Sequence, residues 1–112
     1  MKKLKPVLPS LREKKRYLVF QILGRRIDDS RAASDAIIGS CNGLIGSLGM
    51  ARAGIMMLHN TYDKGMGVIK VNPAYVNELR ASIALTAIEG AVVWSIGLSG
   101  ILKKAQKKFM AG

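Results

Sequence analysis

The sequence predicts an α+β fold: a ferredoxin-like, RNA-recognition-like α-β sandwich. We expect a four-stranded antiparallel sheet with two helices on one face, plus a basic C-terminal helix. The expected elements follow the order strand-helix-strand-strand-helix-strand, which is the split βαβ pattern. The segment KGMGVIKV at 64–71 keeps the frame of the RNA-recognition strand signature. A chain of 112 residues suits a single domain with one core.

The first part of the chain predicts an arm followed by a strand. Residues 1–12 are basic and interrupted by prolines, so we expect an extended arm there. The sandwich is expected over 13–98 and the basic C-terminal helix over 99–112. Alternation predicts a first strand over 14–23. One face of this strand would hold Leu18, Phe20 and Ile22, and the other Tyr17, Val19 and Gln21.

A first helix is expected to begin after Asp28 and Asp29, which supply capping oxygens and negative charge at a helix start. It would end at Gly49. Its apolar stripe would contain Ile37, Ile38, Cys41, Leu44, Ile45 and Leu48. Gly39 and Gly43 lie on the opposite side, and glycine inside a helix costs about 0.5–1 kcal/mol relative to alanine. Their repetition indicates close approach by another backbone, either within the domain or from another subunit.

The second half of the chain predicts two strands, a helix and a last strand. Strands are expected over 50–60 and 66–72, with a turn at 61–65 between them. Asn72 and Pro73 predict the start of the second helix, which would end at Gly90. The last strand is expected over 91–98, with Val92, Trp94, Ile96 and Leu98 on one face. The apolar side of the C-terminal helix would hold Ile101, Leu102, Ala105 and Phe109.

The segment KGMGVIKV lacks the aromatic residues that stack RNA bases in the signature. Met66, Val68 and Val71 stand in their places. Base stacking is worth about 1–3 kcal/mol per base, so an aliphatic face indicates a protein contact instead. Either the C-terminal helix or a partner would cover it. The residues predicted at a protein interface are Tyr17, Val19, Met66, Val68, Gly39 and Gly43.

The net charge of +11 is concentrated at the two ends of the chain. Residues 1–26 carry +8 and residues 91–112 carry +4, whereas the middle is close to neutral. Such ends indicate binding to a polyanion, with solvated tails as the alternative. The first and last strands are neighbours in this fold, so both basic segments would converge and contact phosphates. The predicted RNA-binding residues are Arg12, Lys14, Lys15, Arg16, Lys103, Lys104, Lys107 and Lys108.

No catalytic residue and no metal site are predicted. His59 and Cys41 are the only residues of their types, and neither belongs to a nucleophile-base motif. A single cysteine excludes an intrachain disulfide and fits a reducing compartment. The apolar stretch 81–102 is long enough to span a membrane. Glu89 interrupts it midway at a cost of about 2.5–3.5 kcal/mol, which argues against a membrane protein.

Four segments together resemble the ribonuclease P protein component 2 family of archaea, whose eukaryotic counterpart is a small subunit shared by ribonucleases P and MRP. They are LREKKRYLVFQI (11–22), GLIGSLGMARA (43–53), GVIKVNPAYVNELRASIAL (67–85) and IGLSGILKKAQKKF (96–109). The resemblance covers nearly the whole chain in order. Leu98 stands where a valine is expected, and Ser47 where an acidic residue is common.

The resemblance implies a non-catalytic, cytoplasmic subunit of the ribozyme that removes 5′ leaders from precursor tRNA. The RNA and its Mg²⁺ would form the active site, with no cofactor on the protein. The implied partners are ribonuclease P RNA, precursor tRNA, the TIM-barrel protein component 3 and other ribonuclease P proteins, with a homodimer inside a heterotetramer. The alternative function is a ferredoxin-like ligand-sensing or protein-interaction domain without an RNA role, which leaves the charged ends unexplained.

Overall fold

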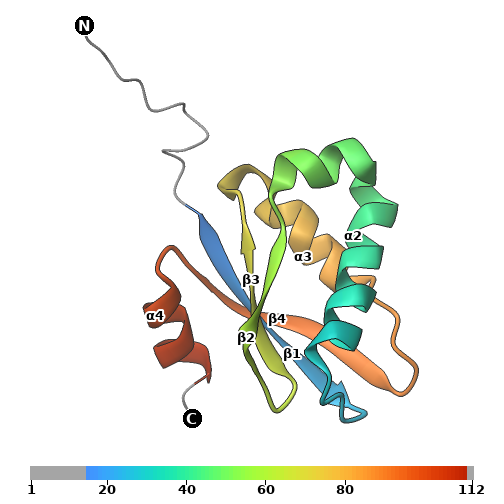
Figure 1. Cartoon of the computed structure of the whole chain (residues 1–112), viewed down its shortest axis with the longest axis vertical. Coiled ribbons are helices and arrows are strands. Elements are labelled where there is room, and N and C mark those ends of the chain that lie inside the picture. Colours follow the sequence, from blue (N-terminus) through green and yellow to red (C-terminus); the bar gives the residue numbers. More distant parts are fainter. Residues whose placement is uncertain (1–14, 111–112) are drawn as a thin grey trace, which may run out of the picture.

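A computed structural model describes residues 15–110 and confirms the predicted fold. The sheet is antiparallel with strand order β2-β3-β1-β4. Helices α2 and α3 lie on one side of it and α4 on the other (Figure 1). In chain order the elements are β1 (Arg16–Gly24), α2 (Ser30–Ala53), β2 (Met56–Asp63), β3 (Met66–Val71), the 3-10 turn η1 (Pro73–Tyr75), α3 (Val76–Ala84), β4 (Ala91–Ser99), α4 (Leu102–Ala105) and the π-helical turn η2 (Gln106–Met110).

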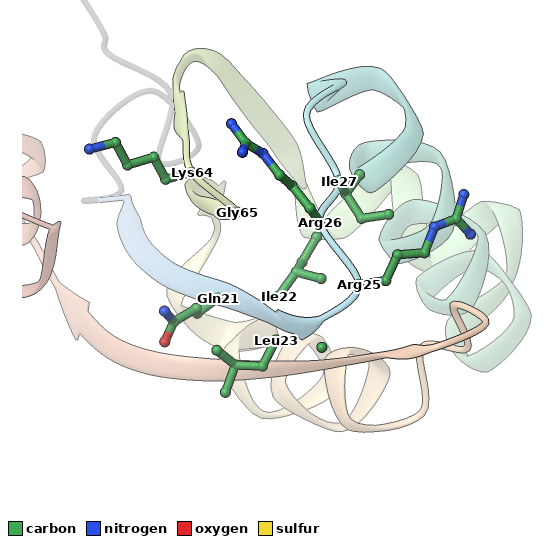
Figure 2. A pocket seen from close by; sticks show the side chains of 9 residues that line it. Gln21, Ile22, Leu23, Arg25, Arg26, Ile27, Lys64 and Gly65 are labelled. Carbon is green, nitrogen blue, oxygen red and sulfur yellow. The ribbon is translucent and has the colours of Figure 1, made fainter.

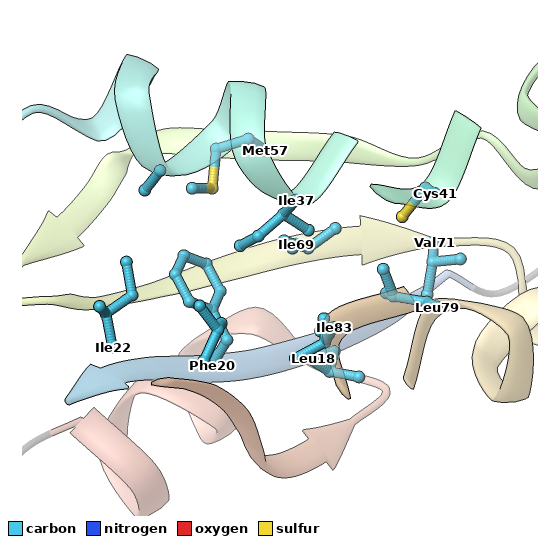
Figure 3. Close-up of a cluster of buried hydrophobic side chains, with 12 residues drawn as sticks. Leu18, Phe20, Ile22, Ile37, Cys41, Met57, Ile69, Val71, Leu79 and Ile83 are labelled. Carbon is cyan, nitrogen blue, oxygen red and sulfur yellow. The ribbon is translucent and has the colours of Figure 1, made fainter. Parts of the chain in front are cut away.

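The main core lies between the sheet and the helices α2 and α3 (Figure 3). A large apolar side chain contributes about 1.5–3 kcal/mol when it is fully buried. The cluster includes Leu18, Phe20, Ile22, Ile37, Cys41, Ile69, Val71, Leu79 and Ile83. The predicted face of Leu18, Phe20 and Ile22 on the first strand is the one that turns to this core. Burial in this cluster raises the pKa of the Cys41 thiol.

A second, smaller cluster lies on the opposite face of the sheet. Val19 and Val68 are fully buried there, beneath Ala105 of α4. Tyr17, Leu58, Met66, Leu102, Phe109 and Met110 pack around them. The C-terminal segment, residues 102–110, therefore covers this part of the face from within the same chain. We call this part the covered half of the sheet.

A β-bulge in β4 corrects the predicted alternation of that strand. Val19 pairs with Gly97 and Phe20 with Ser95, so Ile96 is left unpaired between them. Beyond the bulge, Leu98 packs against the main core, on the face opposite to Trp94. Gly97 consequently faces Phe109, and a Cβ at Gly97 would come within 2.2 Å of its ring. Only glycine leaves room for this aromatic ring.

The first helix is longer than predicted, and the strand predicted over 50–60 is wrong at its start. Helix α2 passes Gly49 and ends at Ala53, and β2 begins at Met56. The capping glycine is Gly54 (φ 61°), whose N–H donates to the carbonyl of Met50 at 3.3 Å. Gly46 breaks the helix with φ 73° and ψ 174°. The predicted turn at 61–65 shortens to Lys64 and Gly65, because β2 continues to Asp63.

The second helix is shorter than predicted. It ends at Ala84, well before Gly90, in a stretch whose β-branched Thr86 and Ile88 are poor helix formers. The Thr86 hydroxyl instead donates to the Ser82 carbonyl at 2.8 Å. Asn72 precedes the 3-10 turn, but its side chain makes no capping bond. Its amide donates to the carbonyl of Arg52 at 2.6 Å, which ties the end of β3 to α2.

Candidate nucleic-acid interface

Two of the predicted RNA-binding residues, far apart in sequence, meet at one edge of the sheet. The start of β1 lies beside the end of β4, since Tyr17 pairs with Ser99. A hollow of about 570 Å³ at this edge is lined by Arg16, Ser99, Gly100, Ile101 and Lys104. A Cβ at Gly100 would lie 3.2 Å from a guanidinium nitrogen of Arg16. The absence of a side chain at Gly100 therefore leaves room for this cation.

A second cationic hollow adjoins the first. It has a volume of about 420 Å³ and is lined by Lys104, Lys107 and Lys108. Lys104 belongs to both hollows, and no carboxylate lines either of them. Lys103 is exposed on the same segment but lines neither hollow. We call the two hollows together the basic edge.

The lysines of the basic edge are positioned by the apolar contacts of the C-terminal segment. Ala105 is buried and Phe109 packs beside it on the covered half of the sheet. The predicted single helix is wrong in detail: a four-residue α4 is followed by the π-helical turn η2. A π turn is wider than an α turn. The lysine spacing therefore does not follow one regular α-helical face, although three of the four lysines still gather.

The remaining predicted RNA-binding residues differ in their surroundings. Arg12 and Lys14 lie outside the described residues. The Lys15 ammonium donates to the side-chain oxygen of Asn72, so it links the start of β1 to the end of β3. Among the described residues, Arg16 and Lys104 are thus the predicted pair that shares a hollow across the two ends of the chain.

The predicted protein-interface residues fall into two groups. Val19 and Val68 are buried and Tyr17 and Met66 half-buried beneath the C-terminal segment, so another chain would reach them only if that segment moved. Gly39 and Gly43 lie exposed on α2, and apart from the adjacent backbone of the helix no atom lies within 4 Å of a Cβ built at either position. Close packing inside the domain therefore does not explain these two glycines.

Sequence reasoning missed the turn that completes the basic edge. The Ser99 hydroxyl accepts from the backbone N–H of Ile101 and lies 3.2 Å from the Ile101 carbonyl, which it also contacts as a donor. This local bonding is typical of serine in turns. The predicted C-terminal helix covers 99–112, whereas in the structure Ser99 ends β4 and α4 begins only at Leu102. The place of this turn beside Arg16 depends on strand pairing, which the local sequence does not reveal.

The remaining histidine and carboxylates of interest among the described residues have structural contacts. The ring of His59 on β2 lies 2.9 Å from the Ser30 hydroxyl, a contact that joins β2 to the start of α2. Asp29 caps α2 by accepting from the Arg31 N–H at 3.0 Å, as predicted. Within residues 15–110, no three His, Cys, Asp or Glu side chains gather as a metal site. Over the same range, no helix has the length and apolar character needed to cross a membrane.

Comparisons with known proteins identify the family of the chain and agree with its fold. The sequence profile of the Rpp14/Pop5 family matches residues 16–110. Ribonuclease P protein component 2 of Thermococcus gammatolerans is 34% identical over 92% of this chain and 88% of its own length. The protein of that name from Methanosarcina acetivorans is also 34% identical, over 96% of this chain and 82% of its own. A chain in the cryo-EM structure of yeast ribonuclease MRP shares the fold, with a TM-score of 0.60, 16% identity, and coverage of 86% of this chain and 78% of that one.

Proposed function

The chain belongs to the Rpp14/Pop5 family, and on this premise we propose that it is a non-catalytic protein subunit of ribonuclease P. This enzyme removes the 5′ leaders of precursor tRNA. The proposal is supported by relatives named ribonuclease P protein component 2 that align over more than nine-tenths of this chain. In this function the protein binds and stabilises the catalytic part of the RNA, and the active site belongs to the RNA and its Mg²⁺.

The observation that carries the proposal is the basic edge. Arg16 from one end of the chain and Lys104 from the other line one hollow without a carboxylate. Closely packed RNA phosphates repel one another, and clustered cations relieve that repulsion by releasing bound counterions. Phosphate contacts fix position without reading sequence. The subunit would therefore stabilise a folded RNA through its shape and charge.

Partners follow from the family and from surfaces that the fold leaves open. We propose a TIM-barrel protein subunit and the other ribonuclease P proteins as partners, with precursor tRNA as the substrate of the assembly and the cytoplasm as its location. The open space above Gly39 and Gly43 on α2 suits close approach by a second copy of the chain. Such a contact would give a homodimer within a heterotetramer.

The test is reconstitution of precursor tRNA cleavage across a Mg²⁺ titration. RNA with this subunit and its TIM-barrel partner should cleave at lower Mg²⁺ than RNA alone, because protein cations replace part of the Mg²⁺ needed to neutralise phosphates. The double variant Arg16→Glu, Lys104→Glu should lose about tenfold or more in RNA affinity and shift the Mg²⁺ requirement back upward.

A matched control makes the same change in charge on the side of the molecule formed by α2 and α3. Arg31 and Arg80 are both exposed there, on α2 and α3. The variant Arg31→Glu, Arg80→Glu should stay within about twofold of the wild type in RNA affinity. Equal losses in both double variants would reject the basic edge as the RNA site. A wild-type chain without salt-dependent RNA binding would favour the ligand-sensing alternative.

A further inference from the structure

The rest of the outer sheet face lies beyond the C-terminal segment and is apolar. Leu23 pairs with Val92, and Gln21 pairs with Trp94, on this uncovered half of the sheet. Val92 is 64% exposed, Trp94 51% and Leu23 41%. Ile96, at the bulge, is exposed beside them. Contiguous exposed apolar residues mark interaction sites, and tryptophan is enriched among the residues that dominate protein-protein binding energy.

The outer edge of β4 is open to a further strand. β4 is the last strand of the sheet, and no described residue pairs with its outer side along Val92–Ser99. Its nine residues include no charged side chain, whereas β2 at the other edge ends in the charged Asp63 and has an irregular register. Native edges are usually protected by charges or bulges. β4 has a bulge but no charge, so its edge suits strand addition by another chain.

A cationic hollow adjoins this apolar surface at the end of β1. It has a volume of about 440 Å³, and its lining includes Leu23, Arg25, Arg26 and Lys64 (Figure 2). Arg26 pairs with Asp28 at 2.8 Å, and this contact raises the pKa of Arg26. Among residues 15–110, Arg25 and Lys64 have no ion-pair partner. These two cations therefore remain available to an incoming carboxylate.

The turn that carries Lys64 is closely defined by its backbone. Lys64 and Gly65 both have positive φ, 52° and 80°. The N–H of Ile22 donates to the Gly65 carbonyl at 2.8 Å, which joins this turn to β1. A turn with two positive φ angles matches the twist of its flanking strands. The base of the Lys64 side chain is thus held beside the end of β1 before any partner binds.

We propose that the β4 edge, the apolar residues Leu23, Val92 and Trp94, and the hollow at Lys64 form one docking surface. Its occupant is an extended segment of another protein subunit of the ribonucleoprotein, with apolar side chains and a neighbouring carboxylate. The segment adds to β4 as a fifth strand, its apolar side chains cover Trp94 and Val92, and its carboxylate pairs with Lys64 or Arg25. This inference rests on the proposed function.

Charge and chemistry favour this occupant over two others. Phosphate contacts dominate nucleic-acid affinity, and β4 itself has exposed apolar side chains and no charge, so cations occur only in the hollow at the end of this surface. A second copy docking through this same surface would bring its own Arg25 and Lys64 toward these two cations, and like charges repel. An apolar and acidic segment instead satisfies both the exposed apolar side chains and the cationic hollow.

Trp94 provides a direct test because it is the only tryptophan in the chain. Its emission is recorded for the full chain alone, with ribonuclease P RNA, and with each purified ribonuclease P protein subunit, starting with the TIM-barrel subunit. We expect one protein subunit to shift the emission to shorter wavelength, to shield Trp94 from acrylamide and to slow amide exchange in β4. A shift caused by RNA alone, or by raising the concentration of the chain alone, would overturn the proposal.

Two variants and a control test the surface residue by residue. Val92→Lys should weaken binding of that subunit by about tenfold or more, and Lys64→Glu by about threefold or more. Leu85→Lys is the matched control, since Leu85 is 67% exposed at the end of α3. It should stay within about twofold of the wild type. Val92→Lys binding as tightly as the control would overturn the proposal.

The readouts separate failure of the docking surface from failure of the proposed function. If the assembled enzyme forms and cleaves while Trp94 emission and β4 exchange stay unchanged, the docking surface is rejected and the function stands. If the wild-type chain binds neither the RNA nor any subunit, the function itself fails. The exchange measurement uses the wild-type chain, so it does not depend on the folding of any variant.

Discussion

The covered and uncovered halves of the outer sheet face share strands and differ in what lies over them. On the covered half, Val19 and Val68 are fully buried beneath the C-terminal segment. On the uncovered half, Val92 and Trp94 remain more than half exposed. Both halves are apolar, so hydrophobicity alone does not separate them. The difference is that residues 102–110 pack on one half and leave the other exposed.

The two halves of the sheet face consequently offer different side chains to a partner. The apolar side chains of the C-terminal segment pack on the sheet, and three of its lysines line the hollows of the basic edge, with Lys104 beside Arg16. The cations therefore lie on the segment that packs over the covered half. The uncovered half keeps its apolar side chains and an uncharged strand edge. We infer that RNA belongs to the first and a protein segment to the second.

The largest expected difference is in the free energy of unfolding, when a carboxylate is placed on one half or on the other. Val19→Asp would bury an unpaired charge in the covered half, which we expect to cost about 3–5 kcal/mol of unfolding free energy. Val92→Asp, on an exposed side chain, should change stability by about 0.5 kcal/mol or less. Urea denaturation of both variants measures the contrast. Similar losses would mean that the C-terminal segment does not seal Val19 from water in solution.

A substitution at Gly97 tests the contact that holds the cover in place. A Cβ there would come within 2.2 Å of the Phe109 ring, so Gly97→Ala forces the ring to move. We expect a loss of about 1–3 kcal/mol from overpacking. The matched control Gly39→Ala, in open space on α2, should be neutral or stabilise by up to about 1 kcal/mol.

A double variant assigns the Gly97 effect to this contact. If Phe109 causes the clash, adding Phe109→Ala to Gly97→Ala should cost less than the sum of the two separate losses. Thermal or urea unfolding of the four proteins gives the coupling energy. Strict additivity would place the origin of the Gly97 effect elsewhere, for example in the bulge itself.

Much of the fold was predictable because it depends on local patterns. The alternation around Leu18 and Phe20 identified the first strand and its inward face, and the KGMGVIKV frame identified the third. The end of α2 was predicted wrongly because glycine occurs both inside helices and at their C-terminal caps. Gly49 suggested the end of α2, yet the capping position with positive φ is Gly54. The break at Gly46 lies before both glycines and carries no distinct signal in one sequence.

The candidate site was predictable only in part, because it depends on pairing between distant strands. The charge at both chain ends indicated Arg16 and Lys104, and the fold brought them to one hollow. The bulge at Ile96 was not predictable, since it leaves the alternation intact until Leu98 turns to the core. Exposure of Trp94 was missed for a similar reason. It depends on how far the C-terminal segment reaches across the sheet.

The salt dependence of RNA affinity should distinguish the cations at the two ends of the sheet face, with a smaller effect than the changes above. Lys104→Gln removes a cation shared by both hollows of the basic edge, so RNA affinity should fall and the slope of log affinity against log salt should decrease by about 0.9. Arg25→Gln, at the uncovered end, should leave the slope unchanged. Binding measured between about 50 and 200 mM salt gives both slopes. Equal changes in slope for Lys104→Gln and Arg25→Gln would mean that RNA contacts both ends of the sheet face.

The smallest expected effect concerns Lys108, whose ammonium lies 5.5 Å from the centroid of the Phe109 ring. An exposed cation-π contact is worth about 0.5–1 kcal/mol, and this one lies near the distance limit of about 6 Å. Lys108→Gln should therefore lower the free energy of unfolding by about 0.5 kcal/mol or less. Lys103 lines neither hollow, and Lys103→Gln should leave the free energy of unfolding unchanged. Urea unfolding at low salt makes the comparison. If Lys108→Gln instead destabilised the chain as much as Gly97→Ala, the cover would depend on its charge rather than on apolar packing, and the two halves of the sheet face would differ for an electrostatic reason.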